Sequence, residues 1–429
     1  MGLKVLYVTA GDPLIHGGPR LMYLYAKSLN MYSDTNAYVL RFVSSNAYKK
    51  RFEIVDSNDI NILHLENNIV LLEETIFNVR TYTFIIERNT HFDSFGTFWV
   101  KPHEITKALK IVLDYIPVDL IHVGALATSY TIHLAFFRPS AIRNKTVGLH
   151  ALYHSSPNQL NNVVKMCYAS LMVKRFHFVT TSTPFEARML KAFNENSVFV
   201  GEMINEWFIE QNIEKIRSKA KHLINTYQLF DKIVLLFVGR RTKYKGYDIV
   251  LKGLYAVITS NTSLKDKLRL IVIGGRGNDD NTEIKALERK LREHKVLIDL
   301  GLTDEITKYG AILSSYVVIL PSYIETIPLV FLEAWRFGKP IIGIDTPSIR
   351  SIVYLKPVSG LLIPLAPHSA MISYIRKIVE LLVSNEFYLQ KLKILGLNGL
   401  RKMQLLFAPY ALSKRLTRLY KTVVEQGVV

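Results

Sequence analysis

Short runs of almost unbroken apolar residues are the feature that most constrains the fold of this chain. "KVLYVTA" (4–10), "KIVLLFVG" (232–239), "LRLIVIGG" (268–275) and "YVVILPS" (316–322) each fill one strand length without a regular polar alternation. Continuous runs of this kind are typical of strands in a parallel sheet, because helices cover both faces of such a sheet. Longer stretches with helical spacing separate the runs, so the sequence predicts repeated βα units.

The runs fall into two series, which predicts an α/β chain with two domains. The pattern pauses near residue 200 and restarts at 232, and the two halves open alike, each with a strand, a glycine-containing loop and a helix. We therefore predict two Rossmann-like parallel-sheet domains facing a cleft. The expected domain bounds are 1–205 and 206–408. The other predicted strands are 37–43, 119–124, 146–150, 176–182, 295–301 and 340–345.

Residues 409–429 are predicted to form a C-terminal helix that could cross back to the N-terminal domain. The stretch "PYALSKRLTRLYKTVVEQ" (409–426) has amphipathic spacing. Packing against a domain is the first interpretation of its apolar face, and contact with a membrane surface is the alternative.

Composition narrows the class of protein. The 429 residues are 49% hydrophobic, as in a globular chain, and the single cysteine, Cys167, excludes an intramolecular disulfide and a cysteine-based metal site. No window has about 18 uninterrupted apolar residues, and the N-terminus is predicted to be a first strand and not a signal peptide. We expect a cytoplasmic protein, which could also lie at the inner face of the membrane.

The net charge of +18 favours anionic partners. Phosphorylated ligands, nucleic acid and an anionic membrane surface all fit such a charge, and so does a basic surface without a specific role. No recognisable nucleic-acid-binding module is present, so no nucleic-acid partner is expected.

Two glutamates interrupt the apolar stretch "PSYIETIPLVFLEAWRFGKPII" (321–342). Glu325 and Glu333 have seven residues between them. A buried carboxylate is unfavourable unless it is paired or hydrogen-bonded, so both need an explanation. Glu325 could complement the dipole of the following helix, and Glu333 could pair with Arg336 one turn later.

The expected helix places the two acids differently. Pro328 suits its first turn and Thr326 is the predicted N-cap residue. Glu325 would then lie in a strand-to-helix loop at the carboxyl edge of the sheet, where such folds bind ligands, and Glu333 would lie inside the helix. The N–H groups at the helix start would face an anion such as phosphate.

A second loop, "VGRRTKYKGYD", follows the strand at 232–239. It contains Arg240, Arg241, Lys243 and Lys245, whose charges could neutralise a diphosphate, although a solvated basic loop has the same composition. Gly274 lies in a glycine turn after the next strand.

The first half contributes Gly17 and Gly18, which would let the backbone approach a ligand closely, and His150 at a strand end. His150 and His154 lack a third metal ligand of known position, so no metal site is predicted.

Together these residues resemble a glycosyltransferase of family 4, a group 1 glycosyl transferase with the GT-B fold. "E-TIPLVFL-E" is similar to the family's pair of glutamates, and "VGRRTKYKG" to its phosphate-binding loop. "SGLLIP" (359–364) and "GG" (17–18) resemble further family motifs.

The resemblance implies a retaining, metal-independent transfer of sugar from a nucleotide-diphosphate sugar to a glycan, lipid-linked or other hydroxyl acceptor. No cofactor is implied beyond that co-substrate. Arg240 and Lys245 would bind the diphosphate, Glu325 the sugar hydroxyls and Glu333 the ribose. His150 would lie near the transferred sugar. The remaining implied donor-binding residues are Gly17, Gly18, Gly274, Thr326 and Ile327.

Two positions depart from the family pattern. Pro328 stands where the family often has glycine, so Ile327 or Leu329 must supply the phosphate-binding N–H. "VGEMINEWF" (200–208) replaces the usual Asn-Gly-Val-Asp segment. The alternative function is a non-catalytic GT-B scaffold or regulatory subunit.

Overall fold

The computed structural model describes residues 2–11, 17–45, 48, 60–66, 69–86, 100–124, 128–151, 159–277 and 282–425. The chain forms two compact units. The N-terminal unit is Met1–Tyr153 and Leu160–Met203 together with Ala408–Val429, and the C-terminal unit is Ile204–Phe407 with His154–Gln159. The C-terminal helix therefore belongs to the N-terminal unit. None of the helices in the described part of the chain is long and apolar enough to span a membrane.

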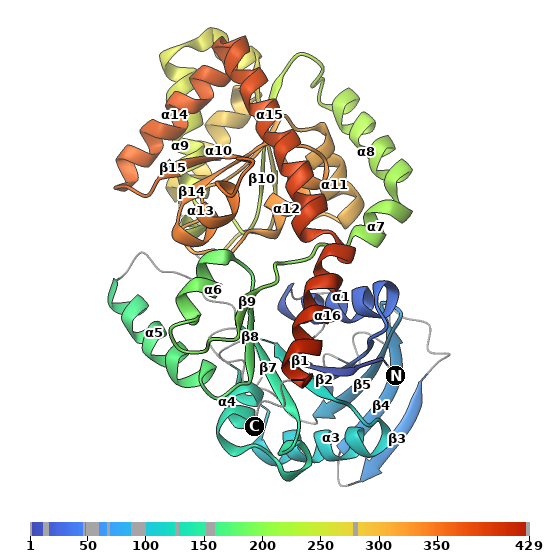
Figure 1. Ribbon diagram of the computed structural model, residues 1–429. Coiled ribbons are helices and arrows are strands. Elements are labelled where there is room, and N and C mark those ends of the chain that lie inside the picture. The colour runs from blue at the N-terminus through green and yellow to red at the C-terminus, as the bar shows by residue number, and fades with distance from the viewer. Residues whose placement is uncertain are drawn as a thin grey trace. The chain divides into compact units, whose positions relative to one another are not determined.

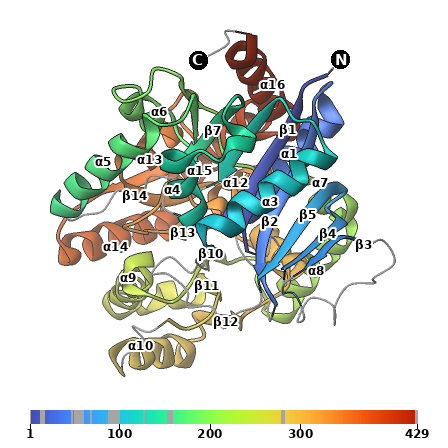
Figure 2. The ribbon, with the colours of Figure 1, turned by 90° about the horizontal axis from the view of Figure 1, so that it is seen from below.

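The N-terminal unit is built on a sheet that is parallel over most of its width (Figures 1 and 2). Its described strands run in the order β3-β4-β5-β2-β1-β6-β7-β8-β9, and only the β3–β4 and β4–β5 pairs are antiparallel. The strands are β1 (Lys4–Ala10), β2 (Asn36–Ser44), β3 (Asn61–Glu66), β4 (Ile69–Ile76), β5 (Val79–Ile86), β6 (Leu120–Gly124), β7 (Thr146–Ala151), β8 (Phe178–Thr181) and β9 (Ser197–Phe199).

The strands of this unit predicted from apolar runs are confirmed, but the sequence interpretation missed β3, β4, β5 and the short β9. β4 and β5 are joined by a tight hairpin at Phe77 and Asn78, which have φ values of 52° and 61°. Left-handed conformations at both loop residues are typical of the turn that suits twisted antiparallel strands. The hairpin lacks the usual Asn-Gly or Asp-Gly pair, so the strongest short-range signal was absent.

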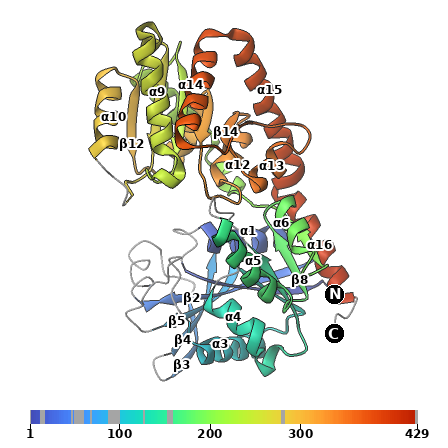
Figure 3. The same cartoon turned by 90° about the vertical axis from the view of Figure 1, so that its left-hand side faces the viewer.

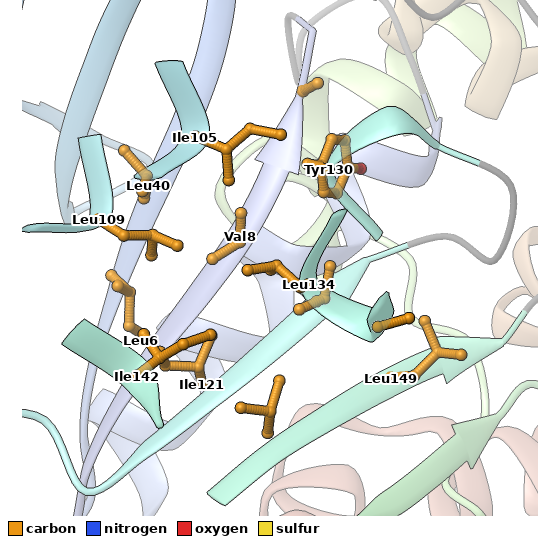
Figure 4. Close-up of a cluster of buried hydrophobic side chains, with 14 of the residues drawn as sticks. Leu6, Val8, Leu40, Ile105, Leu109, Ile121, Tyr130, Leu134, Ile142 and Leu149 are labelled. Carbon is orange, nitrogen blue, oxygen red and sulfur yellow. The ribbon is translucent and has the colours of Figure 1, made fainter. Parts of the chain in front are cut away.

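Successive side chains of a strand point to opposite faces of the sheet, and helices cover both faces here. Leu6 and Val8 point to one face, where they pack in a core with side chains from α3 (Pro102–Tyr115), α4 (Ser129–Phe137) and α5 (Gln159–Val173) (Figure 4). Tyr7 points to the other face, towards α1 (Gly17–Tyr32) and α16 (Pro409–Glu425). The apolar face of α16 is buried against the unit, as expected for residues 409–426.

The C-terminal unit contains a parallel sheet with the described strand order β12-β11-β10-β13-β14-β15. Helix α9 packs against α10 and α14 (Figure 3). Helix α11 packs against α8 and α12. The strands are β10 (Ile233–Val238), β11 (Leu268–Ile273), β12 (Leu297–Gly301), β13 (Val317–Leu320), β14 (Ile341–Asp345) and β15 (Leu361–Pro364). The helices are α7 (Glu206–Gln211), α8 (Ile213–Thr226), α9 (Tyr247–Ser260), α10 (Thr282–Glu293), α11 (Glu305–Ser314), α12 (Leu329–Arg336), α13 (Pro347–Val353), α14 (His368–Ser384) and α15 (Glu386–Lys402).

The start of α12 corrects one prediction. The helix begins at Leu329 with Pro328 in the N-cap position, so Thr326 is not the N-cap and Pro328 is not in the first turn. Pro328 has extended backbone geometry and no side-chain acceptor, and the cap position therefore leaves the first N–H groups of α12 without a side-chain partner. Helix α12 ends at Arg336, and Gly338 follows in the left-handed conformation, as the sequence predicted.

Candidate active site

The carboxyl ends of β10, β11 and β13 meet at one edge of the C-terminal sheet. All three strands are parallel, and each leads into a loop that contains predicted site residues. Ligands of open α/β sheets bind at this edge. The topology therefore brings together segments that are far apart in the sequence.

The loop after β10 and the loop after β13 are joined directly. The backbone carbonyl of Tyr244 accepts hydrogen bonds from the Tyr323 N–H (2.8 Å) and the Ser322 hydroxyl (3.2 Å). Gly246 has a φ of 71°, and a Cβ atom there would lie 2.2 Å from the Pro321 carbonyl oxygen. Only glycine permits both this conformation and this approach, so Gly246 fixes the distance between the loops.

Lys245 and Glu325 form an ion pair across these two loops. The side chains are 19% and 13% exposed, so the pair is partly shielded from water. The neighbouring Arg240 is exposed, and its guanidinium lies 5.4 Å from the centre of the Tyr244 ring. Three of the four residues predicted to be catalytic thus gather on two joined loops, with two cations beside one carboxylate.

Arg241 does not belong to this group, which corrects its place among the diphosphate-binding candidates. Its side chain is 4% exposed and pairs with Glu288 (3.3 Å) and Asp299 (2.8 Å). Although burial opposes the effect, the hydrogen bond from Arg241 holds the pKa of Asp299 below its usual range. Arg241 therefore ties the loop after β10 to α10 and β12.

Glu333 is buried within α12 and pairs with Lys308 of α11 (2.7 Å). The predicted alternative, a pair with Arg336, is wrong, because Arg336 faces Glu206. Burial alone would lower the pKa of Lys308, but the charges of Glu333 and Glu305 outweigh it and hold that pKa above the ordinary lysine value. The sequence analysis did not identify Lys308 as a partner of Glu333, because no local pattern around Lys308 indicates that pairing.

The remaining donor-binding candidates of this unit lie on the same loops. Thr326 and Ile327 are buried between β13 and α12. Gly274 follows β11 with a φ of 134°, and a Cβ atom there would lie 2.0 Å from the carbonyl oxygen of Gly239. The close approach of the two loops accounts for glycine at position 274.

A pocket of about 550 Å³ opens between these loops, α9 and α14. Tyr244 and Tyr323 line it, next in the chain to Lys245 and close to Glu325. Asp248, which the sequence interpretation did not select, lies in the pocket wall and contacts His368 Nε2 at 2.6 Å.

The candidates of the N-terminal unit are Gly17, Gly18 and His150. The two glycines open α1. His150 lies at the carboxyl end of β7 with 1% of its surface exposed, and its Nδ1 lies 2.9 Å from the Thr180 hydroxyl. His154 lies outside the described residues. Within the described ranges, no group of three metal-ligating side chains is placed to hold a metal ion.

Residues 219–387, which include all seven candidate residues of the C-terminal unit, match the family described as glycosyl transferases group 1. This region is similar to group 1 glycosyltransferases. D-inositol 3-phosphate glycosyltransferase of Stackebrandtia nassauensis is 31% identical over 142 residues, and that of Thermobifida fusca is 29% identical over 150 residues. These matches cover 31% and 34% of this chain and 30% and 34% of the relatives. The chain thus matches about a third of their length.

Solved structures resemble the whole chain. Sucrose-phosphate synthase from Thermosynechococcus elongatus has a TM-score of 0.65 at 17% identity, covering 99% of this chain and 100% of that one. Anabaena HepE in complex with UDP has a TM-score of 0.67 at 15% identity, covering 98% and 100%. The chain therefore has the GT-B fold that the sequence resemblance implied, and the region similar to group 1 glycosyltransferases lies in its second half.

Proposed function

We propose that this protein is a nucleotide-sugar-dependent glycosyltransferase that retains the anomeric configuration of the transferred sugar. The observation that carries the proposal is the partly shielded Lys245–Glu325 pair, with Arg240 beside it, on two joined loops of the region similar to group 1 glycosyltransferases. Two cations can bind a diphosphate, and one carboxylate can accept hydrogen bonds from sugar hydroxyls. The cluster can therefore bind both the diphosphate and the sugar on either side of the bond that breaks.

In this proposal the leaving diphosphate determines the chemistry. Negative charge grows on the bridging oxygen as the bond to the sugar breaks, and Arg240 and Lys245 stabilise that charge. Glu325 accepts hydrogen bonds from hydroxyls of the donor sugar and so holds its reacting carbon in place. Glu333, oriented by Lys308, accepts hydrogen bonds from the nucleotide ribose. The acceptor hydroxyl then attacks from the side of the leaving group, which gives retention.

The same cluster supports a reaction that uses a nucleotide-diphosphate sugar and no metal or other cofactor. Arg240 and Lys245 supply the positive charge that a divalent cation would otherwise bring to a diphosphate. The complex of HepE with UDP and glucose and the complex of HepE with UDP-glucose support this class of donor. The acceptor we propose is a hydroxyl of a glycan or of a lipid-linked glycan. The matched relatives are named for inositol phosphate, but the match covers only about a third of this chain and of theirs.

A basic and aromatic patch on the N-terminal unit supports a peripheral contact with an anionic membrane at its cytoplasmic face. Phe137 and Leu171 are 69% and 62% exposed. The Arg175 guanidinium lies 5.2 Å from the ring of Phe136, and Arg138 donates a hydrogen bond to the carbonyl of Arg175. Aromatic and basic side chains together suit the boundary between lipid headgroups and acyl chains.

Flotation with anionic vesicles at low salt tests the membrane contact. The wild type should co-float, and Phe137→Ser with Leu171→Ser should weaken that association. A wild type that stays with the soluble fraction would remove the membrane contact from the proposal, without affecting the glycosyltransferase assignment.

Two substitutions test the glycosyltransferase function. Lys245→Ala should weaken binding of the nucleoside diphosphate itself, because a diphosphate contact is lost. Glu325→Gln keeps the size of the side chain and should leave nucleoside diphosphate affinity within about threefold, while transfer falls by roughly 100-fold or more. Near-wild-type transfer by both folded variants would refute the assignment. Donor binding without transfer by the wild type to any hydroxyl acceptor would favour a non-catalytic scaffold.

A further inference from the structure

A row of buried polar side chains crosses the N-terminal unit from α16 to His150. The Tyr7 and Tyr420 hydroxyls are 2.7 Å apart, and the Tyr420 hydroxyl lies 2.6 Å from His122 Nδ1. His122 Nε2 lies 3.0 Å from the Thr180 hydroxyl, which lies 2.9 Å from His150 Nδ1. All five side chains are at most 1% exposed, so each proton in the row must be placed between protein atoms.

The row ends at a carboxylate. The Ser182 hydroxyl donates a hydrogen bond to the Glu202 carboxylate. His150 Nε2 faces both groups, 3.4 Å from the Ser182 oxygen and 4.0 Å from Glu202 Oε1. An ionised carboxylate can only accept hydrogen bonds, and a serine hydroxyl has a single proton. Ser182 therefore has no proton left to donate to His150.

For a neutral His150 ring, this end fixes every proton in the row. His150 Nε2 faces only acceptors, so it carries the proton, and in the neutral ring Nδ1 is then an acceptor. The Thr180 hydroxyl donates to that Nδ1 and must itself accept from His122 Nε2–H. His122 Nδ1 consequently accepts from the Tyr420 hydroxyl, whose oxygen accepts from Tyr7.

The charge state of His122 agrees with this order. Burial lowers the pKa of His122 far below its ordinary value, and the neighbouring His150 lowers it further. A neutral ring has one donor and one acceptor, which are the two roles that the row requires of His122.

The two nitrogens of His150 are held very differently. Nδ1 has a hydrogen bond of ordinary length, whereas the 3.4 Å contact of Nε2 is longer than a normal hydrogen bond. The loosely bonded N–H lies at the carboxyl end of β7, the edge at which ligands of such sheets bind.

We propose that Tyr420, His122 and Thr180 are positioning residues that, together with Glu202, hold His150 as the Nε2–H tautomer, so that this N–H donates to an oxygen of a sugar bound at the carboxyl edge of the N-terminal sheet in place of Ser182. The helix α16, although distant in sequence, thereby supports that edge of the sheet. The role of His150 towards a sugar rests on the proposed function, whereas the tautomer does not.

The tautomer is measured directly on the full-length wild type. Histidine labelled with ¹⁵N in the ring, observed by long-range ¹H–¹⁵N correlation at neutral pH, distinguishes Nε2–H, Nδ1–H and charged rings, and His122→Gln and His150→Asn assign the signals. Both rings should be neutral Nε2–H tautomers. A charged ring or an Nδ1–H tautomer at either position would overturn the proposal, whether or not the protein transfers sugar.

Tyr420→Phe tests the coupling to the reaction, because it removes the hydroxyl and keeps the ring packed on Phe178. We expect kcat to fall by about tenfold, the effect of one buried hydrogen bond, with donor KM within twofold. The matched control is Tyr410→Phe, a 59% exposed tyrosine on the same helix, which should leave both constants unchanged. An unchanged kcat in folded Tyr420→Phe would refute the coupling, and an inactive wild type would refute the proposed function instead.

Discussion

Arg240 and Arg241 are neighbours in the sequence but should respond to substitution in opposite ways. Arg240→Ala should leave the free energy of unfolding nearly unchanged, because the side chain is exposed and contacts only the face of Tyr244 among the contacts recorded for the described residues. Arg241→Ala should destabilise the protein, because Arg241 is buried between Glu288 and Asp299.

The remaining contacts set the size of the Arg241→Ala effect. Removing one partner of a buried ion pair costs about 3–5 kcal/mol. Glu288 keeps Arg276 and the Tyr247 hydroxyl (both 2.7 Å), and Asp299 keeps Arg292 (2.9 Å). Because neither carboxylate is left alone, we expect the lower end of that range, about 3 kcal/mol.

Chemical denaturation and thermal melting of the full-length protein measure this difference. In a unit of about 200 residues, 3 kcal/mol corresponds to a fall in Tm of roughly 6–12 °C. Arg240→Ala should shift Tm by less than about 2 °C and should weaken donor binding. The separation of the two roles would be refuted if Arg241→Ala lowered the free energy of unfolding by less than about 1 kcal/mol. It would also be refuted if Arg240→Ala lowered that free energy by about 3 kcal/mol.

Three further substitutions test other parts of the site and its support. Lys308→Met should weaken binding of a nucleoside diphosphate by about tenfold and leave binding of inorganic diphosphate unchanged, because it releases Glu333 at the ribose end; calorimetric titration compares the two ligands. Gly246→Ala should destabilise by at least about 2 kcal/mol in urea unfolding, because it combines a left-handed conformation with a clash against the Pro321 carbonyl; equal stability would contradict that packing. Burial lowers the pKa of Lys402 to about 7, against 10.5 in the unfolded chain, so the unfolded state binds more protons between these values and wild-type stability should rise with pH across this window. Relative to Lys402→Met, that rise should reach as much as about 3 kcal/mol by pH 9.5 in urea unfolding, and parallel profiles would contradict it.

The sequence predicted the parts of the fold that depend on local pattern. Continuous apolar runs marked the parallel strands, and loops that follow such strands meet at one sheet edge, which is why Lys245 and Glu325 could be placed together from 80 residues apart. The β4–β5 hairpin was missed because Phe77, a bulky residue that rarely adopts the left-handed conformation, stands at the first position of its turn.

Long-range pairing of charged groups could not be read from the sequence. Arg241 and Lys245 belong to the same basic loop, yet one side chain is buried against two carboxylates from α10 and β12 and the other reaches Glu325. Lys308 lies 25 residues from Glu333 and joins it only because α11 packs beside α12. His150 was selected for its strand end, but its partners Thr180, His122 and Tyr420 come from elements whose proximity is a property of the folded sheet.

A thermal-shift titration with UDP-, GDP- and ADP-sugars, without added metal, tests the central claim most directly. Saturation at about 100 times the dissociation constant stabilises a protein by about 2.7 kcal/mol, which is readily seen as a rise in Tm. We predict that one donor class stabilises the wild type and fails to stabilise Lys245→Ala, while Tyr410→Phe responds as the wild type does. A folded wild type that no donor stabilises, or a Lys245→Ala variant stabilised equally, would contradict a donor site at the Lys245–Glu325 pair.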